Sequence, residues 1–230
     1  MNILKKNNWN KSYENKDNFV FYPNEEIIRF ISKYIRKKTG LDSFINIDKK
    51  NPKILDFGCG IGRHVKFLDD YKLDAYGFDL SEEAIYYAHQ YFKKLNLDHL
   101  QKKIIVSDIT NLPYESKYFN YMLSHGVLDS MSYEIAKKGI KELHRVMDSK
   151  GIIFFDLIST LDTSFKKGNN MDQLVENDHE NGTIQSYYNL NKINNLLNDK
   201  FTIIELYENS RIDHINNSLL NRFNVVAQKI

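Results

Sequence analysis

Short runs of apolar residues alternate with amphipathic segments along most of the chain. Helical spacing of apolar residues predicts helices at Glu25–Lys37, from a Ser81 cap to about Lys94, and from a Ser132 cap to about Met147. Strands separated by such helices pair in parallel, with helices on both faces of the sheet. Seven apolar runs have the length of buried strands: Lys53–Phe57, Asp74–Phe78, Lys103–Val106, Tyr118–Leu123, Gly151–Leu157, Phe201–Tyr207 and Phe223–Gln228.

The end of the chain departs from this alternation. The last two predicted strands are joined by a polar segment with little helical pattern, which predicts an antiparallel hairpin. The expected fold class is therefore α/β, with a seven-stranded, mostly parallel sheet and an antiparallel C-terminal hairpin strand.

No internal repeat or low-complexity linker divides the sequence, so we expect one domain over residues 1–230. Two polar stretches, residues 1–18 and Thr160–Gln185, look mobile. We interpret residues 1–22 as a candidate N-terminal lid and residues 160–185 as a candidate substrate loop. Simple disorder is the alternative interpretation.

The composition is that of a globular protein. Hydrophobic residues make up 42% of the chain, charged residues 27%, and the formal net charge is +2, which favours an enzyme over a disordered or nucleic-acid-binding chain. No apolar run approaches the roughly 20 residues that span a bilayer, and the first residues are too polar for a signal peptide. We therefore expect a cytoplasmic protein without nucleic-acid or membrane partners.

Cysteine and histidine usage narrows the chemistry further. The single cysteine, Cys59, excludes an internal disulfide and agrees with a reducing compartment. We interpret it as a small packing residue rather than a nucleophile. The seven histidines show no spacing with nearby cysteines or carboxylates that would indicate a metal site, so no metal is expected.

One predicted strand runs into a turn with three alternating glycines, Gly58, Gly60 and Gly62, and then into a helix. Glycines let the backbone approach a ligand closely, and a helix N-terminus offers free N–H groups. A dinucleotide site would need its third glycine where Arg63 stands, so the nicotinamide fingerprint fails. The acidic Asp56 at the strand end suits a ligand with an ammonium group better than a pyrophosphate.

This segment resembles the first motif of the class I S-adenosylmethionine-dependent methyltransferases. The resemblance covers about Ile27 to Phe155 well and the rest of the chain by topology alone. It implies a Rossmann-like three-layer sandwich, with S-adenosyl-L-methionine as cofactor and S-adenosyl-L-homocysteine as product. It would place the three glycines along the methionine part of the cofactor, and Asp56 near its amino group.

Two more acids follow strands in the order of this family. Asp79 ends the second strand 21 residues after Gly58, where a carboxylate can accept from both ribose hydroxyls. A dehydrogenase would place an acid similarly, so Asp79 alone does not discriminate. By the resemblance, Asp108 accepts from the adenine amino group and the Ile109 N–H faces a ring nitrogen. The family usually has Asp where this chain has Asn120.

Leu80, Ser124 and Tyr13 are further candidate cofactor contacts. An aromatic face can stabilise a sulfonium cation, so Tyr13 is a candidate to close over the cofactor, with ordinary packing as the alternative.

His125 follows the fourth predicted strand, at the ligand-binding edge of an open sheet. It is a candidate general base for an oxygen nucleophile, as is Asp129, and the alternatives for His125 are a cofactor or substrate contact and a packed histidine. His64, just after the glycine turn, is expected to be structural.

Three functions remain open from the sequence. The first is an enzyme (EC 2.1.1.-) that methylates an oxygen or nitrogen of a small-molecule acceptor, such as a sugar or other metabolite. The fourth strand is not followed by the Asn-Pro-Pro-Tyr or Asp-Pro-Pro-Tyr motif that family members acting on nucleobase or glutamine nitrogens often carry. The second is a catalytically idle cofactor-binding partner or sensor module, and the third, disfavoured by Arg63, is an NAD-dependent oxidoreductase. The acceptor and the oligomeric state stay open.

Overall fold

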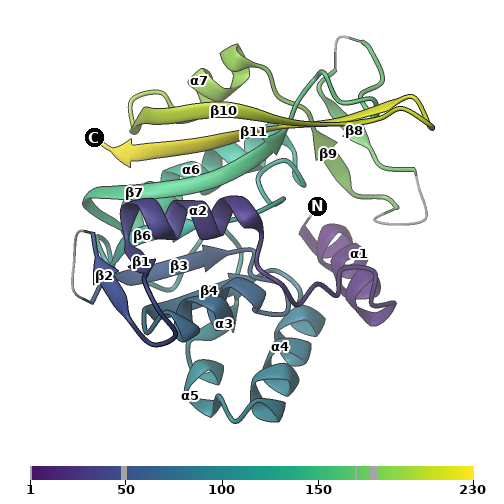
Figure 1. The fold of residues 1–230 in the computed structure, drawn as a ribbon. Helices are drawn as coiled ribbons and strands as arrows, with labels where there is room; N and C mark the ends of the chain where they lie inside the picture. Colours follow the sequence, from purple (N-terminus) through teal and green to yellow (C-terminus); the bar gives the residue numbers. More distant parts are fainter. Residues whose placement is uncertain (1, 48–50, 169, 177–180) are drawn as a thin grey trace.

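A computed structural model describes residues 2–47, 51–168, 170–176 and 181–230, and a seven-stranded sheet runs through its centre (Figure 1). The strand order is β10-β11-β7-β6-β3-β4-β5. The strands are β3 (Lys53–Phe57), β4 (Asp74–Asp79), β5 (Ile104–Val106), β6 (Phe119–Leu123), β7 (Met147–Ile158), β10 (Phe201–Asp213) and β11 (Ser218–Lys229). Strand β11 lies antiparallel between β7 and β10, and the other neighbours pair in parallel. The predicted fold class is confirmed.

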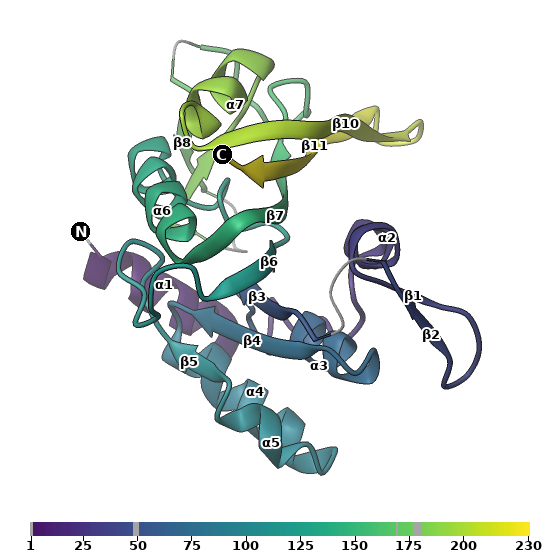
Figure 2. The same cartoon turned by 90° about the vertical axis from the view of Figure 1, so that its left-hand side faces the viewer.

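Helices cover both faces of the sheet, which gives three layers (Figure 2). One face packs against α6 (Tyr133–Val146) and α7 (Leu190–Leu197), and the other against α2 (Glu25–Tyr34), α3 (Arg63–Asp70) and α4 (Glu82–Lys94). Successive strand residues serve opposite faces, since Ile54 belongs to the second core and Leu55 to the first. Smaller elements complete the fold: α1 (Asn2–Glu14), α5 (Asp98–Gln101), β1 (Arg36–Lys38), β2 (Phe44–Asn46), β8 (Asp172–Leu174) and β9 (Ile184–Ser186).

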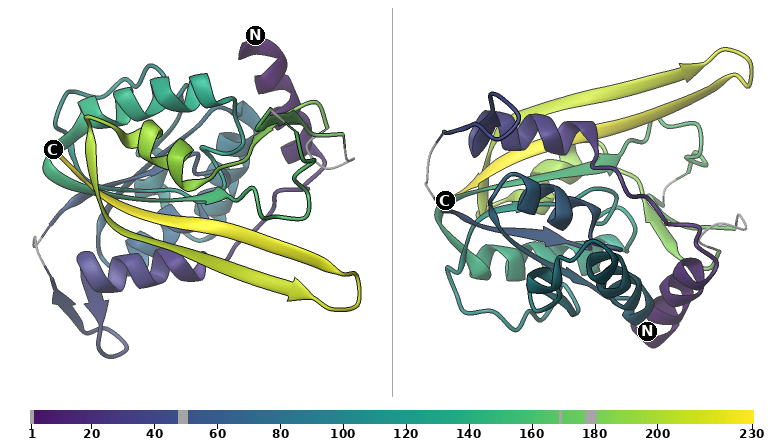
Figure 3. Two further views of the ribbon diagram at one scale, coloured as in Figure 1. Left: turned by 90° about the horizontal axis from the view of Figure 1, so that it is seen from above. Right: turned by 60° about the horizontal axis from the view of Figure 1, so that its bottom comes forward.

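The N-terminal stretch forms a regular helix, α1, where the sequence analysis expects a mobile segment. The sequence pattern does not predict this helix because the segment is mostly polar and its few apolar residues do not gather on one helical face. Trp9 and Tyr13 are one helical turn apart, and this i, i+4 spacing is the signal that was available. Helix α1 lies beside α4 (Figure 3), where Lys6 pairs with Glu82.

The predicted helix Glu25–Lys37 is three residues too long. Helix α2 ends at Tyr34 because the chain turns at Ile35 and continues as β1. The Arg36 guanidinium then donates to the carbonyls of Tyr71 and Lys72, which anchors the chain away from the helix axis.

The candidate substrate loop carries a short hairpin of its own. Strands β8 and β9 pair antiparallel within it, while residues 169 and 177–180 of the predicted loop lie outside the described part of the chain. Beside it, the hairpin β10–β11 extends past the end of β7 (Figure 3). In the part of the chain that the structure describes, no helix combines the length and the apolar character needed to cross a membrane.

Candidate functional site

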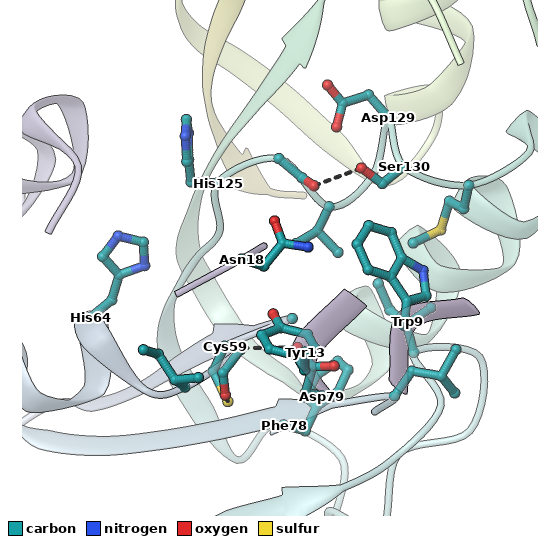
Figure 4. A pocket seen from close by; sticks show the side chains of 18 of the residues that line it. Trp9, Tyr13, Asn18, Cys59, His64, Phe78, Asp79, His125, Asp129 and Ser130 are labelled. Carbon is teal, nitrogen blue, oxygen red and sulfur yellow. Dashed lines mark hydrogen bonds between the residues drawn. The ribbon is translucent and has the colours of Figure 1, made fainter. Parts of the chain in front are cut away.

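A cavity of about 400 Å³ opens where β3, β4, β5 and β6 reach their carboxyl ends (Figure 4). Side chains from separate elements meet there because parallel strands deliver their loops to one edge of the sheet. Eight of the residues predicted to contact the cofactor or to act in catalysis line this cavity: Tyr13, Gly58, Gly60, Asp79, Leu80, Asp108, Ile109 and His125. Among the described residues, the lining does not include Asp56, Gly62 or Ser124, so their predicted contacts stay predictions.

The glycine loop takes backbone conformations that other residues rarely adopt. Gly60 has φ +55°, and a β-carbon there would lie 2.6 Å from the Tyr13 hydroxyl. Gly62 has φ +82°, and a β-carbon there would lie 2.5 Å from Cζ of Phe92. The two glycines therefore differ in purpose, because Gly60 faces the cavity and Gly62 makes room for helix packing.

Asp79 organises the loop through backbone bonds. Its Oδ2 accepts from the Gly60 N–H at 2.8 Å, and its Oδ1 from the Ser81 N–H at 2.9 Å. Burial raises the pKa of Asp79, and these backbone donors oppose the rise. The acid therefore fixes the glycine turn while it faces the cavity.

Asp56 lies behind the glycine turn as a buried carboxylate. Neither of its oxygens has a hydrogen-bond partner among the described residues, and Nδ1 of His64 stands 3.6 Å from Oδ1. A buried carboxylate that has only this one long contact with a donor among the described residues is costly. The position therefore fits a ligand that brings an ammonium group or a water-mediated donor, as the class I resemblance implies.

Asp108 and Ile109, which are predicted to contact adenine, and Ser124 are held by local interactions. Asp108 Oδ1 accepts from the backbone N–H and the hydroxyl of Thr110, which shapes the turn after β5. Ile109 is buried against Gly139 of α6. Ser124 donates to the Phe57 carbonyl at 2.8 Å and so ties β6 to β3.

His125 forms a close pair with Asp156, which the sequence analysis did not single out. Nδ1 of His125 lies 2.6 Å from Oδ2 of Asp156, a residue near the end of β7. The other carboxylate oxygen accepts from the Gly126 N–H at 2.7 Å. This arrangement favours a proton on Nδ1 and leaves Nε2 as the proton acceptor.

Asn24, the N-cap of α2, is a second residue that the sequence analysis missed. Its side chain accepts from the Glu26 N–H, its own N–H donates to Nε2 of His64 at 3.2 Å, and its Nδ2 lies 3.4 Å from Nε2 of His125. One capping residue therefore contacts both histidines. Asn before Glu-Glu signals the cap in sequence, but nothing there indicates the histidines.

Helix α1 closes one side of the cavity. Trp9 and Tyr13 line it from this helix, and Asn10 accepts from the Ser81 hydroxyl at 2.7 Å. Tyr13 is 8% exposed, although it belongs to a segment of polar composition. The helix therefore stands where the sequence analysis places a candidate lid.

Comparisons with known proteins agree with this geometry. A family model described as a methyltransferase domain matches residues 48–214. An uncharacterized protein from Rickettsia prowazekii is 32% identical over 106 residues, which cover 44% of this chain and 41% of that protein. The chain thus spans about two fifths of the length of the curated relatives it matches.

Solved structures share the fold at lower identity. A structure titled as a SAM-dependent methyltransferase from Methanosarcina mazei superposes with a TM-score of 0.66 at 20% identity, covering 79% of this chain and 94% of that one. A structure titled as a [4+2]-cyclase has a TM-score of 0.64 at 14% identity, covering 91% and 86%. The same fold thus carries different reactions, and the chemistry must be argued from the site.

Proposed function

The chain belongs to the methyltransferase domain family, its cofactor is S-adenosylmethionine, and on this premise we propose that it methylates an oxygen or nitrogen of a small-molecule acceptor. The observation that supports transfer, rather than cofactor binding alone, is the His125–Asp156 pair at the cavity wall. A cofactor-binding module has no need of a carboxylate-oriented imidazole beside its ligand.

The cofactor fits the residues of this chain. Asp79 faces the cavity for the ribose hydroxyls, and Asp108 and Ile109 line it where the adenine is expected. Asp56 lies behind the glycine turn, outside the lining, so its carboxylate would hold the ammonium group through a water-mediated donor. Gly58 and Gly60 line the cavity with backbone alone, and the Tyr13 hydroxyl lies over Gly60. When bound, S-adenosylmethionine supplies an electrophilic methyl group on a sulfonium.

The chain's own residues then align the acceptor and exclude water. Nε2 of His125 removes the proton from a hydroxyl acceptor, and Asp156 stabilises the imidazolium that results. An amine acceptor has only to arrive neutral, and His125 then takes the proton that the product releases. Trp9 and Tyr13 close the cavity from α1.

The alternatives differ in what they require of the site. A catalytically idle sensor would bind the cofactor and tolerate loss of the His125 imidazole. An NAD-dependent oxidoreductase would need a pyrophosphate beside the glycine loop, where the buried Asp56 carboxylate would repel it.

A methyl-transfer assay tests the proposal. Purified protein is incubated with isotope-labelled S-adenosylmethionine and a panel of hydroxyl- and amine-bearing metabolites, sugars included. We expect labelled product with at least one acceptor, and a drop of about 10²–10⁴-fold in rate for His125→Asn, as for loss of a general base. Turnover of no acceptor by a protein that binds the cofactor would support the sensor.

A further inference from the structure

Arg222 reaches the site from β11, a strand outside the well-matched part of the sequence. Its Nε donates to Asp156 Oδ2 at 2.7 Å, and the same oxygen lies 2.6 Å from Nδ1 of His125. Its Nη2 donates to Asp129 Oδ2 at 2.6 Å. The guanidinium therefore joins the carboxylate behind His125 to a second buried carboxylate.

These bonds leave Asp156 little freedom. Its Oδ2 accepts from Nε of Arg222 and lies against Nδ1 of His125, and its Oδ1 accepts from the Gly126 N–H. The side chain is only 3% exposed. Because each carboxylate oxygen has its own donors, the group is held in one rotamer against the imidazole.

The charges around the pair are unevenly matched. Arg222 faces two carboxylates, those of Asp129 and Asp156, so the trio has a net charge of −1 when both are ionised. Burial raises the pKa of Asp156, but Arg222 and His125 outweigh burial and hold it well below its usual range. Burial also raises the pKa of Asp129, against the effect of Arg222.

Other charged and polar side chains also lie near His125. From α3, His64 and Arg63 line the cavity with it, and from the α2 cap Asn24 contributes a neutral amide at 3.4 Å. Arg222 differs from all of these because it contacts the same carboxylate oxygen as His125, Oδ2 of Asp156.

We propose that Arg222 is the positioning residue of the candidate base: it fixes Asp156 against His125 and couples its own charge to the imidazole through the shared carboxylate oxygen. The proposal rests on the proposed role of His125 as proton acceptor. Arg222 acts in two ways, since its positive charge disfavours a second cation nearby and it competes for the oxygen that would stabilise an imidazolium.

A purely structural salt bridge between β11 and β7 would leave the titration of His125 unchanged. The test is therefore the pKa of His125, followed by NMR of ¹³C-histidine-labelled protein in complex with S-adenosylhomocysteine, with His125→Asn to assign the signal. We expect Arg222→Met to raise this pKa by about one unit or more, the effect of removing a neighbouring cation. Arg211→Met, on the exposed part of the same hairpin, is the matched control and should leave it unchanged.

A second variant covers the case in which Arg222→Met does not fold, because an uncompensated buried carboxylate is strongly destabilising. Arg222→Met with Asp129→Asn removes one charge of each sign, and we expect a smaller shift in the same direction. A pKa within about 0.2 unit of the wild type in either folded variant would overturn the proposal.

The titration needs no turnover, so the two proposals fail separately. If the pKa shifts but His125→Asn methylates as fast as the wild type, the base role falls and the coupling of Arg222 to His125 stands.

Discussion

The hydroxyl of Tyr13 stands 2.6 Å from the position that a β-carbon on Gly60 would take. A side chain from α1 therefore lies close against a turn after β3 that is far from it in the sequence, and both residues line the cavity. This close approach makes the glycine loop intolerant of a larger residue on two grounds, the positive φ of Gly60 and the space that Tyr13 occupies.

Gly60 should therefore tolerate no side chain if the cofactor is to bind. Gly60→Val places two methyl groups between the loop and the cavity, so we expect binding of S-adenosylhomocysteine to become undetectable by calorimetry. The matched control is Gly168→Val, because a β-carbon at that exposed position would lie 3.9 Å from the Lys166 carbonyl oxygen, an ordinary van der Waals distance. Unchanged affinity in a folded Gly60→Val protein would remove this glycine from the site.

Asp79 and Asp74 allow a comparison along one strand, since they stand at opposite ends of β4. Asp79→Ala removes a charged acceptor from the cavity, and we expect cofactor binding to weaken by about 1.5–3 kcal/mol. Asp74 pairs with Lys103, and Asp74→Ala should bind like the wild type. Calorimetric titration measures both, and a loss of a few tenths of a kcal/mol at Asp79 would reduce it to a turn residue.

His64 predicts a pH dependence of stability. Burial lowers its pKa below the usual 6.5, although the nearby Asp56 opposes this. The unfolded chain therefore binds the proton more readily, so the free energy of unfolding should fall as the pH drops below about 6.5, by up to about 1.4 kcal/mol per pH unit. It should level off once the pH is below the folded-state pKa.

Urea unfolding at pH 7 and pH 5 measures this effect. His64→Gln has no such proton to bind, so the gap in unfolding free energy between wild type and variant should change between the two pH values in favour of the variant at pH 5. A gap that is equal at both values would show that His64 does not titrate in this range.

Trp9 provides an optical test of the lid, because it is the chain's single tryptophan and lines the cavity from α1. We expect its fluorescence to change as S-adenosylhomocysteine is titrated in, with the same midpoint as calorimetry. Trp9→Phe should abolish the signal. Emission that stays constant while calorimetry detects binding would place α1 outside the cofactor's reach.

The sequence predicts the sheet well because parallel buried strands are continuous apolar runs. The seven predicted runs correspond to the seven strands of the sheet, and β3 is matched residue for residue. Asn120, where the resemblance departs, lies at the start of β6, and its amide accepts from the Lys53 N–H and donates to Asp148, away from the cavity. The departure therefore leaves the cavity intact.

The contacts around His125 could not be predicted in the same way. Asp156 and Arg222 are distant in sequence from His125. Asp156 meets it because β7 runs parallel beside β6, and Arg222 joins them because β11 runs antiparallel beside β7. Asn24 likewise reaches the histidines from a helix cap. Local patterns indicate strands and caps, but not which side chains the strand order brings together.

The role of every residue in this cavity depends on whether the glycine loop and its acids bind S-adenosylmethionine. Calorimetric titration of the purified protein with S-adenosylmethionine, S-adenosylhomocysteine and, as control ligand, NAD measures this binding. We expect micromolar binding of the first two ligands and none of NAD. Binding of NAD alone would show that the glycine loop holds a dinucleotide instead.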